Sequence, residues 1–135
     1  MPGRGRAVQS GQDMEFEVVQ LAEALGLDAR RQFRVGRRIW GAVRVIDVVA
    51  RHPDTRQTLG IECKYQGSTG SAEEKIPSTV LDIEAWPIAG IIVFAGEGFS
   101  ANMRSYLYST GKAVDLDDLD MWLRLFFGLD LEGWS

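Results

Sequence analysis

Hydrophobic positions along the chain change spacing several times, and each spacing predicts a type of element. Within residues 13–25 apolar side chains recur every three or four positions, as on one face of a helix, and Gly26 follows as a stop signal. The β-branched runs 43–50 and 58–65 flank a Pro-Asp turn signal at 53–54, which predicts an antiparallel hairpin. The first half therefore predicts a helix followed by a meander of strands.

The second half of the chain predicts further alternation of helices and strands. Residues 1–10 show no periodicity and are expected to form a flexible basic tail. Residues 11–135 then form one mixed α/β domain, in keeping with a composition of 45% hydrophobic and 25% charged residues. The expected later elements are a helix over 77–86, a buried strand over 89–96, a helix over 100–110, a short strand over 113–116 and a last helix capped by Asp117.

Charge is unevenly distributed along a chain whose net charge is −4. Residues 1–70 carry 11 basic and 8 acidic side chains, whereas residues 71–135 carry 4 and 11. Arginine outnumbers lysine by 12 to 3, and arginine can bind a phosphate through two parallel hydrogen bonds. The negative net charge argues against broad, non-specific coating of nucleic acid. We instead expect a local phosphate-binding face that uses some of Arg30, Arg31, Arg34, Arg37 and Arg38.

Charged residues interrupt the two apolar runs of the predicted hairpin. Asp47 lies within VIDVV, and Glu62 and Lys64 lie within IECKY. If the turn is centred after Asp54, paired residues have numbers that sum to 109, so that Asp47 lies opposite Glu62 with Cβ atoms about 4.5–5.5 Å apart. Lys64 lies two residues further on and shares that face. A slip of one residue in this register would separate the two carboxylates.

Two carboxylates this close repel each other unless a cation lies between them. Mg²⁺ prefers hard oxygen ligands and often uses only one or two carboxylates. A bound metal ion can polarise a phosphoryl oxygen and activate a water, and a neighbouring ammonium can stabilise the developing charge. The residue types therefore suit phosphodiester hydrolysis. The alternative is an exposed polar strand in which Glu62 and Lys64 form an ordinary surface ion pair.

The segments VID at 45–47 and IECK at 61–64 resemble the D-(x)n-E-x-K core of the PD-(D/E)XK nuclease superfamily. That superfamily includes restriction endonucleases, archaeal Holliday-junction resolvases and many repair nucleases. Its members commonly carry a further acid on a preceding helix, and the segment 11–26 is similar, with Glu15 a better match than its rival Glu17.

The downstream segment 89–120 is similar to the Mrr-like restriction branch of the same superfamily, with its strand, Gly-Phe-Ser turn, helix and final short strand. The resemblance thus spans residues 11 to about 120. One departure from the pattern is that Ile46, and no proline, precedes Asp47. That position is variable in the superfamily, so the departure leaves the assignment of Asp47 intact.

The resemblance implies a restriction-endonuclease-like, three-layer α/β/α domain with a central mixed β-sheet. It also implies a divalent-metal-dependent DNA endonuclease that uses Mg²⁺, for which Mn²⁺ would substitute. By this likeness Asp47, Glu62 and the carbonyl of Cys63 would bind the metal, and Glu15 would contribute through water or a second metal ion. The thiol of Cys63 should instead pack on the opposite face of the strand.

The remaining roles implied by the resemblance concern the attacking water. Lys64 would assist that water or the transition state, and Gln66 would contact the phosphate or the water. An alternative function is a catalytically silent nuclease fold that binds DNA or assembles complexes, although retention of the acids and the lysine argues against it. A third reading is a metal-independent binding protein in which the same residues form an ion pair.

Partners and compartment follow from broader features of the chain. No apolar run approaches the roughly 20 residues of a membrane span, and residues 1–10 lack the apolar centre of a secretory signal. With Cys63 as the only cysteine, a reducing cytoplasm is the simplest expectation. A domain of this size has little room for a separate recognition module. DNA recognition would then depend on DNA structure, on a homodimer or on a protein partner.

Overall fold

One mixed five-stranded sheet organises the computed structural model, which describes residues 8–37, 43–68 and 71–131. The strand order is β1-β2-β3-β4-β5; the first three strands are antiparallel, and β3, β4 and β5 are parallel. The strands are β1 (Asp28–Arg37), β2 (Val43–Arg51), β3 (Thr58–Tyr65), β4 (Ala89–Ala95) and β5 (Ala113–Asp115). The helices are α1 (Gly11–Ala24), α2 (Ile76–Glu84), α3 (Ala101–Ser109) and α4 (Leu119–Phe127), with 3₁₀ turns η2 (Ser71–Lys75) and η3 (Leu116–Asp118).

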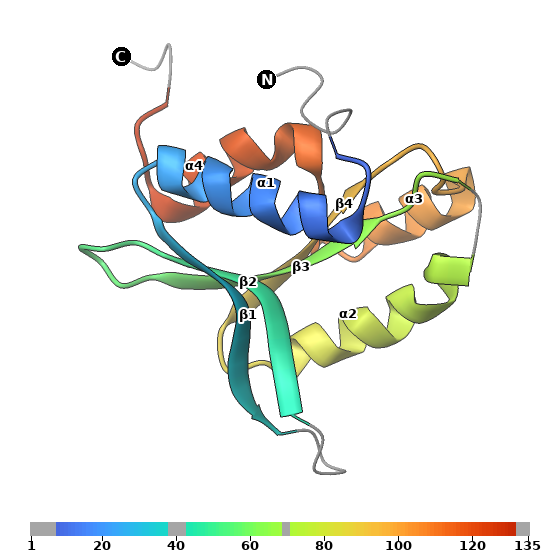
Figure 1. Ribbon diagram of the computed structural model, residues 1–135, viewed down its shortest axis with the longest axis horizontal. Coiled ribbons are helices and arrows are strands. Elements are labelled where there is room, and N and C mark those ends of the chain that lie inside the picture. Colours follow the sequence, from blue (N-terminus) through green and yellow to red (C-terminus); the bar gives the residue numbers. More distant parts are fainter. Residues whose placement is uncertain (1–7, 38–42, 69–70, 132–135) are drawn as a thin grey trace.

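Helices cover both faces of this sheet, as Figure 1 shows for α1 and α4 on one side and α2 on the other. The first hydrophobic cluster joins α1 and α4 to the sheet and includes Met14, Val18, Leu119 and Leu123. The second joins α2 and α3 to the opposite face and includes Ile76, Ile83, Phe94 and Leu107. The expected three-layer α/β/α architecture is therefore confirmed. None of the helices in the described ranges is long and apolar enough to cross a membrane.

The first helix begins and ends where local signals predict. The Ser10 hydroxyl accepts a hydrogen bond from the Asp13 backbone N–H at 3.0 Å, and Gly26 adopts a φ of +88° after the helix ends. Val8, however, is buried in the first hydrophobic cluster. The packed part of the chain therefore starts before residue 10, so the flexible tail expected over 1–10 extends too far toward the C-terminus. Residues 1–7 lie outside the described residues.

The start of the last helix differs from its sequence prediction. The sequence predicts Asp117 as the cap, but the carboxylate of Asp115 accepts the hydrogen bond, from the backbone N–H of Asp117 at 2.9 Å. This contact begins the turn η3, and α4 starts at Leu119 without a side-chain cap. An aspartate readily bonds the backbone two residues ahead of it, which explains why the turn precedes the helix.

The hairpin of β2 and β3 has the register that the sequence predicts. Its observed pairs are Val48 with Ile61, Val49 with Gly60, Ala50 with Leu59 and Arg51 with Thr58, and each pair of numbers sums to 109. The turn between the strands is held by the imidazole of His52, whose Nδ1 accepts from the backbone N–H groups of Asp54 and Thr55. His52 is therefore a structural residue of the turn.

Candidate active site

Pairing between β2 and β3 ends one residue before the two predicted acids would face each other. There the backbone N–H of Asp47 donates to Glu62 Oε1 at 3.2 Å, and the backbone N–H of Cys63 donates to Asp47 Oδ2 at 2.9 Å. The two carboxylates thus take the place of backbone acceptors at the end of the ladder. The structure brings Asp47 and Glu62 together, although by these crossed hydrogen bonds rather than by a regular strand pair.

The neighbouring ammonium group lies on the Glu62 side of this arrangement. Lys64 Nζ is 3.9 Å from Glu62 Oε2, and the side chains of Lys64 and Glu62 are 28% and 16% exposed. A contact of this length in a half-buried setting leaves the ammonium able to donate to another group. The lysine is therefore close to the acids and still reachable from solvent.

Electrostatics at the site disfavour two ionised acids. Burial raises the pKa of Glu62 to about 7, and the negative charge of Asp47 adds to this rise. Burial also raises the pKa of Asp47; the charge of Glu15 acts in the same direction, and the hydrogen bond from Cys63 opposes it. A cation placed between the carboxylates would relieve this repulsion.

The helix acid that reaches this site is Glu15. Its Oε1 accepts a hydrogen bond from Gln32 Nε2 at 2.8 Å and lies 3.2 Å from the Arg31 guanidinium. The charge of Glu15 contributes to the raised pKa of Asp47, so Glu15 lies near the first predicted acid. Its role as the helix acid, in preference to Glu17, stays a prediction. The paired Arg31 also lies 4.0 Å above the ring of Phe16, so this arginine is engaged within the fold.

Gln32 is a residue of the site that the sequence pattern does not reveal. It is directly opposite Asp47 in the β1–β2 register, between the pairs Arg31–Val48 and Phe33–Ile46, yet it forms no pair in the ladder. Its φ is +51°, a left-handed conformation that is uncommon for glutamine. Its side-chain amide donates a hydrogen bond to Glu15, and its interaction with the Asp47 carboxyl opposes the rise in the pKa of that acid. Its place opposite Asp47 follows from the pairing register of β1 with β2, which the sequence alone does not give.

The donor set fits a hard divalent cation. Asp47 and Glu62 offer carboxylate oxygens at one point, and the Cys63 carbonyl lies between Glu62 and Lys64 in the chain. Within the described ranges, no three His, Cys, Asp or Glu side chains form a cluster able to enclose a metal ion. Two carboxylates with retained waters are a common Mg²⁺ arrangement, and Glu15 would then act through one of those waters.

Gln66 is placed differently from the other predicted residues. Its side chain is only 6% exposed, and its Nε2 donates to the Gly98 carbonyl at 2.7 Å and to Glu73 Oε2 at 3.2 Å. The amide hydrogens are thus used within the fold, while Oε1 has no hydrogen-bond partner in the described structure. Cys63 is also buried, and burial raises the pKa of its thiol well above the ordinary value, as suits a packed side chain.

The predicted arginines separate into distinct groups. Arg31 is paired with Glu15, whereas Arg30 and Arg34 are exposed on β1. The side chain of Arg37 and the whole of Arg38 lie outside the described residues. A further arginine that the sequence did not single out, Arg44, bonds Asp82 at 3.2 Å and so ties β2 to α2 beside the site.

Comparison with known proteins adds a family assignment to this geometry. A family model described as the PD-(D/E)XK nuclease superfamily domain matches residues 6–122. No curated protein matches the chain. A crystal structure described as a protein of unknown function, AF1548, is similar in fold with a TM-score of 0.53 and 21% sequence identity. That similarity covers 75% of this chain and 55% of the other, so the chain spans about half of that protein.

Proposed function

Because this chain belongs to the PD-(D/E)XK nuclease superfamily, we propose that it is a divalent-metal-dependent nuclease that cleaves phosphodiester bonds in DNA. The observation that carries the proposal is the half-buried pair of Asp47 and Glu62, held by crossed hydrogen bonds beside Lys64. Burial raises the pKa values of both acids, which disfavours two ionised carboxylates with no cation between them. Groups perturbed in this way are more frequent at catalytic sites.

Each residue of the site has a task that its position supports. Asp47, Glu62 and the Cys63 carbonyl would hold Mg²⁺, and Mn²⁺ would substitute for it. When bound, the ion supplies a Lewis acid that polarises a phosphoryl oxygen and lowers the pKa of a water. Lys64 would donate a hydrogen bond to the attacking water or to the phosphoryl oxygens, where negative charge develops.

Glu15 and Gln32 would orient this machinery from the other side. The Gln32 amide donates to Glu15 and also interacts with the Asp47 carboxyl, whose pKa it lowers, so that it would help to orient both acids. Glu15, which is engaged by Gln32 and Arg31, would accept a hydrogen bond from a water bound at the metal. We call Gln32 a positioning residue because its contacts are to the acids.

Substrate recognition would depend on DNA structure more than on a long sequence. The described ranges form one sheet with its flanking helices, and a domain of this size has little room for a separate recognition module. A homodimer would supply two sites for two strands, and a protein partner would supply further contacts. Branched or partly single-stranded DNA is therefore the preferred substrate class in this proposal.

A cleavage assay on a panel of labelled DNAs tests the proposed function. Blunt duplex, single-stranded, flap and four-way-junction DNAs are incubated with Mg²⁺ or Mn²⁺ and wild-type protein, Lys64→Ala or Lys112→Ala. We expect Lys64→Ala to lose about 100-fold or more in rate, as for removal of other transition-state donors. Lys112→Ala, a matched loss of a lysine before β5, should cleave normally.

Two results would overturn the proposal. One is equal cleavage by wild type and Lys64→Ala, which would place the activity at another site or in a contaminant. The other is calorimetry that detects no binding of Mg²⁺ or Mn²⁺ with or without DNA, which favours the silent binding module. Metal binding by wild type that is lost in Asp47→Ala supports the enzyme independently of turnover.

A further inference from the structure

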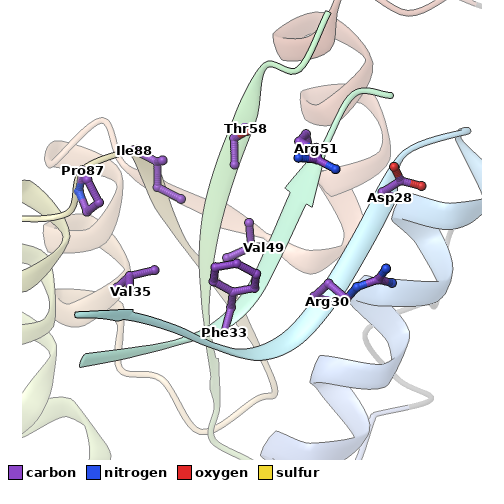
Figure 2. A pocket seen from close by; sticks show the side chains of 9 residues that line it. All are labelled: Asp28, Arg30, Phe33, Val35, Val49, Arg51, Thr58, Pro87 and Ile88. Carbon is purple, nitrogen blue, oxygen red and sulfur yellow. The ribbon is translucent and has the colours of Figure 1, made fainter. Parts of the chain in front are cut away.

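A pocket of about 390 Å³ opens on the sheet face that α2 partly covers. Figure 2 shows Phe33 near its centre, with Val35 and Ile88 on one side and Arg30, Arg51 and Asp28 on the other. Phe33 is 44% exposed, whereas its neighbours Val35 and Ile88 pack against the second hydrophobic cluster. The pocket thus combines an aromatic floor, an apolar wall and a charged wall.

Gln32, which has a left-handed backbone and belongs to the candidate active site, directly precedes Phe33 of this pocket. Along β1, Asp28 and Arg30 point to the pocket, and regular alternation would turn Phe33 to the opposite face. The left-handed conformation of Gln32 shifts the alternation, so that Phe33 joins Arg30 in lining the pocket. Gln32 contacts the acids while its neighbour Phe33 lines the pocket, which places the two sites next to each other along β1.

The charged wall carries two cations that the surrounding fold does not neutralise. Neither Arg30 nor Arg51 forms a hydrogen bond or an ion pair with any side chain in the described part of the protein. Asp28 is the register partner of Arg51 across the strands, but the two form no ion pair. Two guanidinium groups beside one carboxylate give the wall a net positive charge, which favours an anionic ligand.

We propose that this pocket binds one unpaired nucleotide of the substrate, with its base against the Phe33 ring and its phosphate at Arg30 and Arg51. Stacking of bases on exposed aromatic rings beside arginines is the general mode by which proteins hold single strands. The pocket lies within the range of about 300–1,000 Å³ usual for small-ligand sites, so one nucleotide fits it and a duplex does not. Asp28 and Thr58 offer polar groups to the base edge.

The inference rests on the proposed nuclease function and deepens it, because it names the substrate as DNA with an unpaired nucleotide next to the cut. A purely apolar ligand would leave both arginines unused. A duplex would contact them through its backbone alone and would not reach the Phe33 ring. An unpaired nucleotide uses the aromatic floor and the charged wall together.

Binding without metal tests this proposal separately from catalysis. Fluorescence anisotropy in EDTA compares a blunt duplex with the same duplex bearing a short unpaired DNA or RNA overhang. We expect wild type to bind the DNA overhang at least about fivefold more tightly than the blunt duplex, and Phe33→Ala to lose that preference. Phe33→Tyr, which keeps the ring, should retain it, and the RNA overhang shows whether the pocket requires deoxyribose.

Matched variants separate the pocket from general surface effects. Met121→Ala removes a similarly exposed apolar side chain from α4, on the other face of the sheet, and should bind like wild type. Replacement of both Arg30 and Arg51 by glutamine should flatten the slope of log affinity against log salt by about 0.7 for each phosphate no longer neutralised, whereas Arg34→Gln should not. Because all these side chains are exposed, circular dichroism should show folded proteins.

The outcomes distinguish this inference from the proposed function. Equal binding of overhang and blunt duplex by wild type, or equal loss in Phe33→Ala and Met121→Ala, overturns the pocket while leaving cleavage by the acids untouched. Overhang binding that depends on Phe33 in a protein that neither binds metal nor cleaves supports the pocket and overturns the nuclease.

Discussion

The side-chain amide of Gln32 donates a hydrogen bond to Glu15 Oε1 at 2.8 Å, and so joins the edge strand β1 to helix α1 beside the candidate active site. The same side chain also interacts with the carboxyl of Asp47, the first acid of the site, and opposes the rise in its pKa. One neutral residue therefore organises two carboxylates from different elements. It does so in a left-handed backbone conformation, which costs a residue with a Cβ atom about 1–2 kcal/mol.

Loss of the Gln32 amide should impair metal binding and cleavage without unfolding the protein. We expect Gln32→Ala and Gln32→Gly to bind Mn²⁺ roughly tenfold more weakly, as is usual when a residue that orients a metal ligand is removed. The two variants should differ in stability, because glycine tolerates the φ of +51° and alanine does not. Gln32→Gly should therefore be about 1 kcal/mol more stable than Gln32→Ala in urea unfolding. Equal metal affinity in wild type and both variants would refute the positioning role.

The raised pKa of Glu62 predicts an unusual dependence of stability on pH. Folding raises this pKa from 4.5 to about 7, so the protonated carboxyl is favoured in the folded state. The stability from this group is full below pH 4.5 and is lost as the pH rises through 7. Glu62→Gln keeps a neutral side chain at every pH, so we expect it to exceed wild type in stability at pH 8 by on the order of 2 kcal/mol.

Urea unfolding in EDTA at pH 5 and pH 8 measures this difference. Wild type and Glu62→Gln should be similar at pH 5 and diverge at pH 8. Glu84→Gln, which changes an exposed carboxyl on α2, serves as the control and should follow wild type at both values. A Glu62→Gln variant that is less stable than wild type at pH 8 would show that the ionised carboxylate is stabilised in the absence of metal.

Metal ions should stabilise the folded protein in a pH-dependent manner. Ligands must be deprotonated to bind a metal, and the pKa of about 7 at Glu62 opposes binding under mildly acidic conditions. We expect Mg²⁺ or Mn²⁺ to raise the thermal midpoint at pH 8 and to raise it less at pH 6. At about 100 times the Kd the gain corresponds to about 2.7 kcal/mol. Thermal scans of Asp47→Asn should show no metal-dependent rise, and an undiminished rise would place the ion elsewhere.

Replacing Gln66 tests whether its side chain has a structural or a catalytic role. Because its Nε2 bonds to Gly98 and Glu73 inside the protein, we expect Gln66→Ala to lower the free energy of unfolding by about 1–3 kcal/mol. Its cleavage rate under conditions where the variant is fully folded should fall much less than that of Lys64→Ala. A Gln66→Ala variant with wild-type stability and a strongly reduced cleavage rate would instead support the predicted contact between Gln66 and the phosphate.

The sequence by itself determined the elements and the pairing of the central hairpin. Residues 13–25 could be assigned to a helix, and the register of β2 with β3 could be predicted, because both depend on local spacing and on one short turn. That register was enough to nominate Asp47 and Glu62 as neighbours. Burial of Val8 and the cap by Asp115 were missed, since neither residue differs in type from ordinary tail or turn residues.

Only the tertiary structure decided how the acids are held and what lies beside them. The ladder ends at Asp47 because side-chain carboxylates take the backbone bonds, and the alternation of β1 shifts at Gln32 because one residue adopts a positive φ. Neither the end of the β2–β3 pairing nor the positive φ of Gln32 can be predicted from hydrophobic spacing. That spacing reflects which positions are buried and carries no information on a single backbone angle. Burial of Gln66 and exposure of Phe33 likewise depend on contacts between segments far apart in the chain.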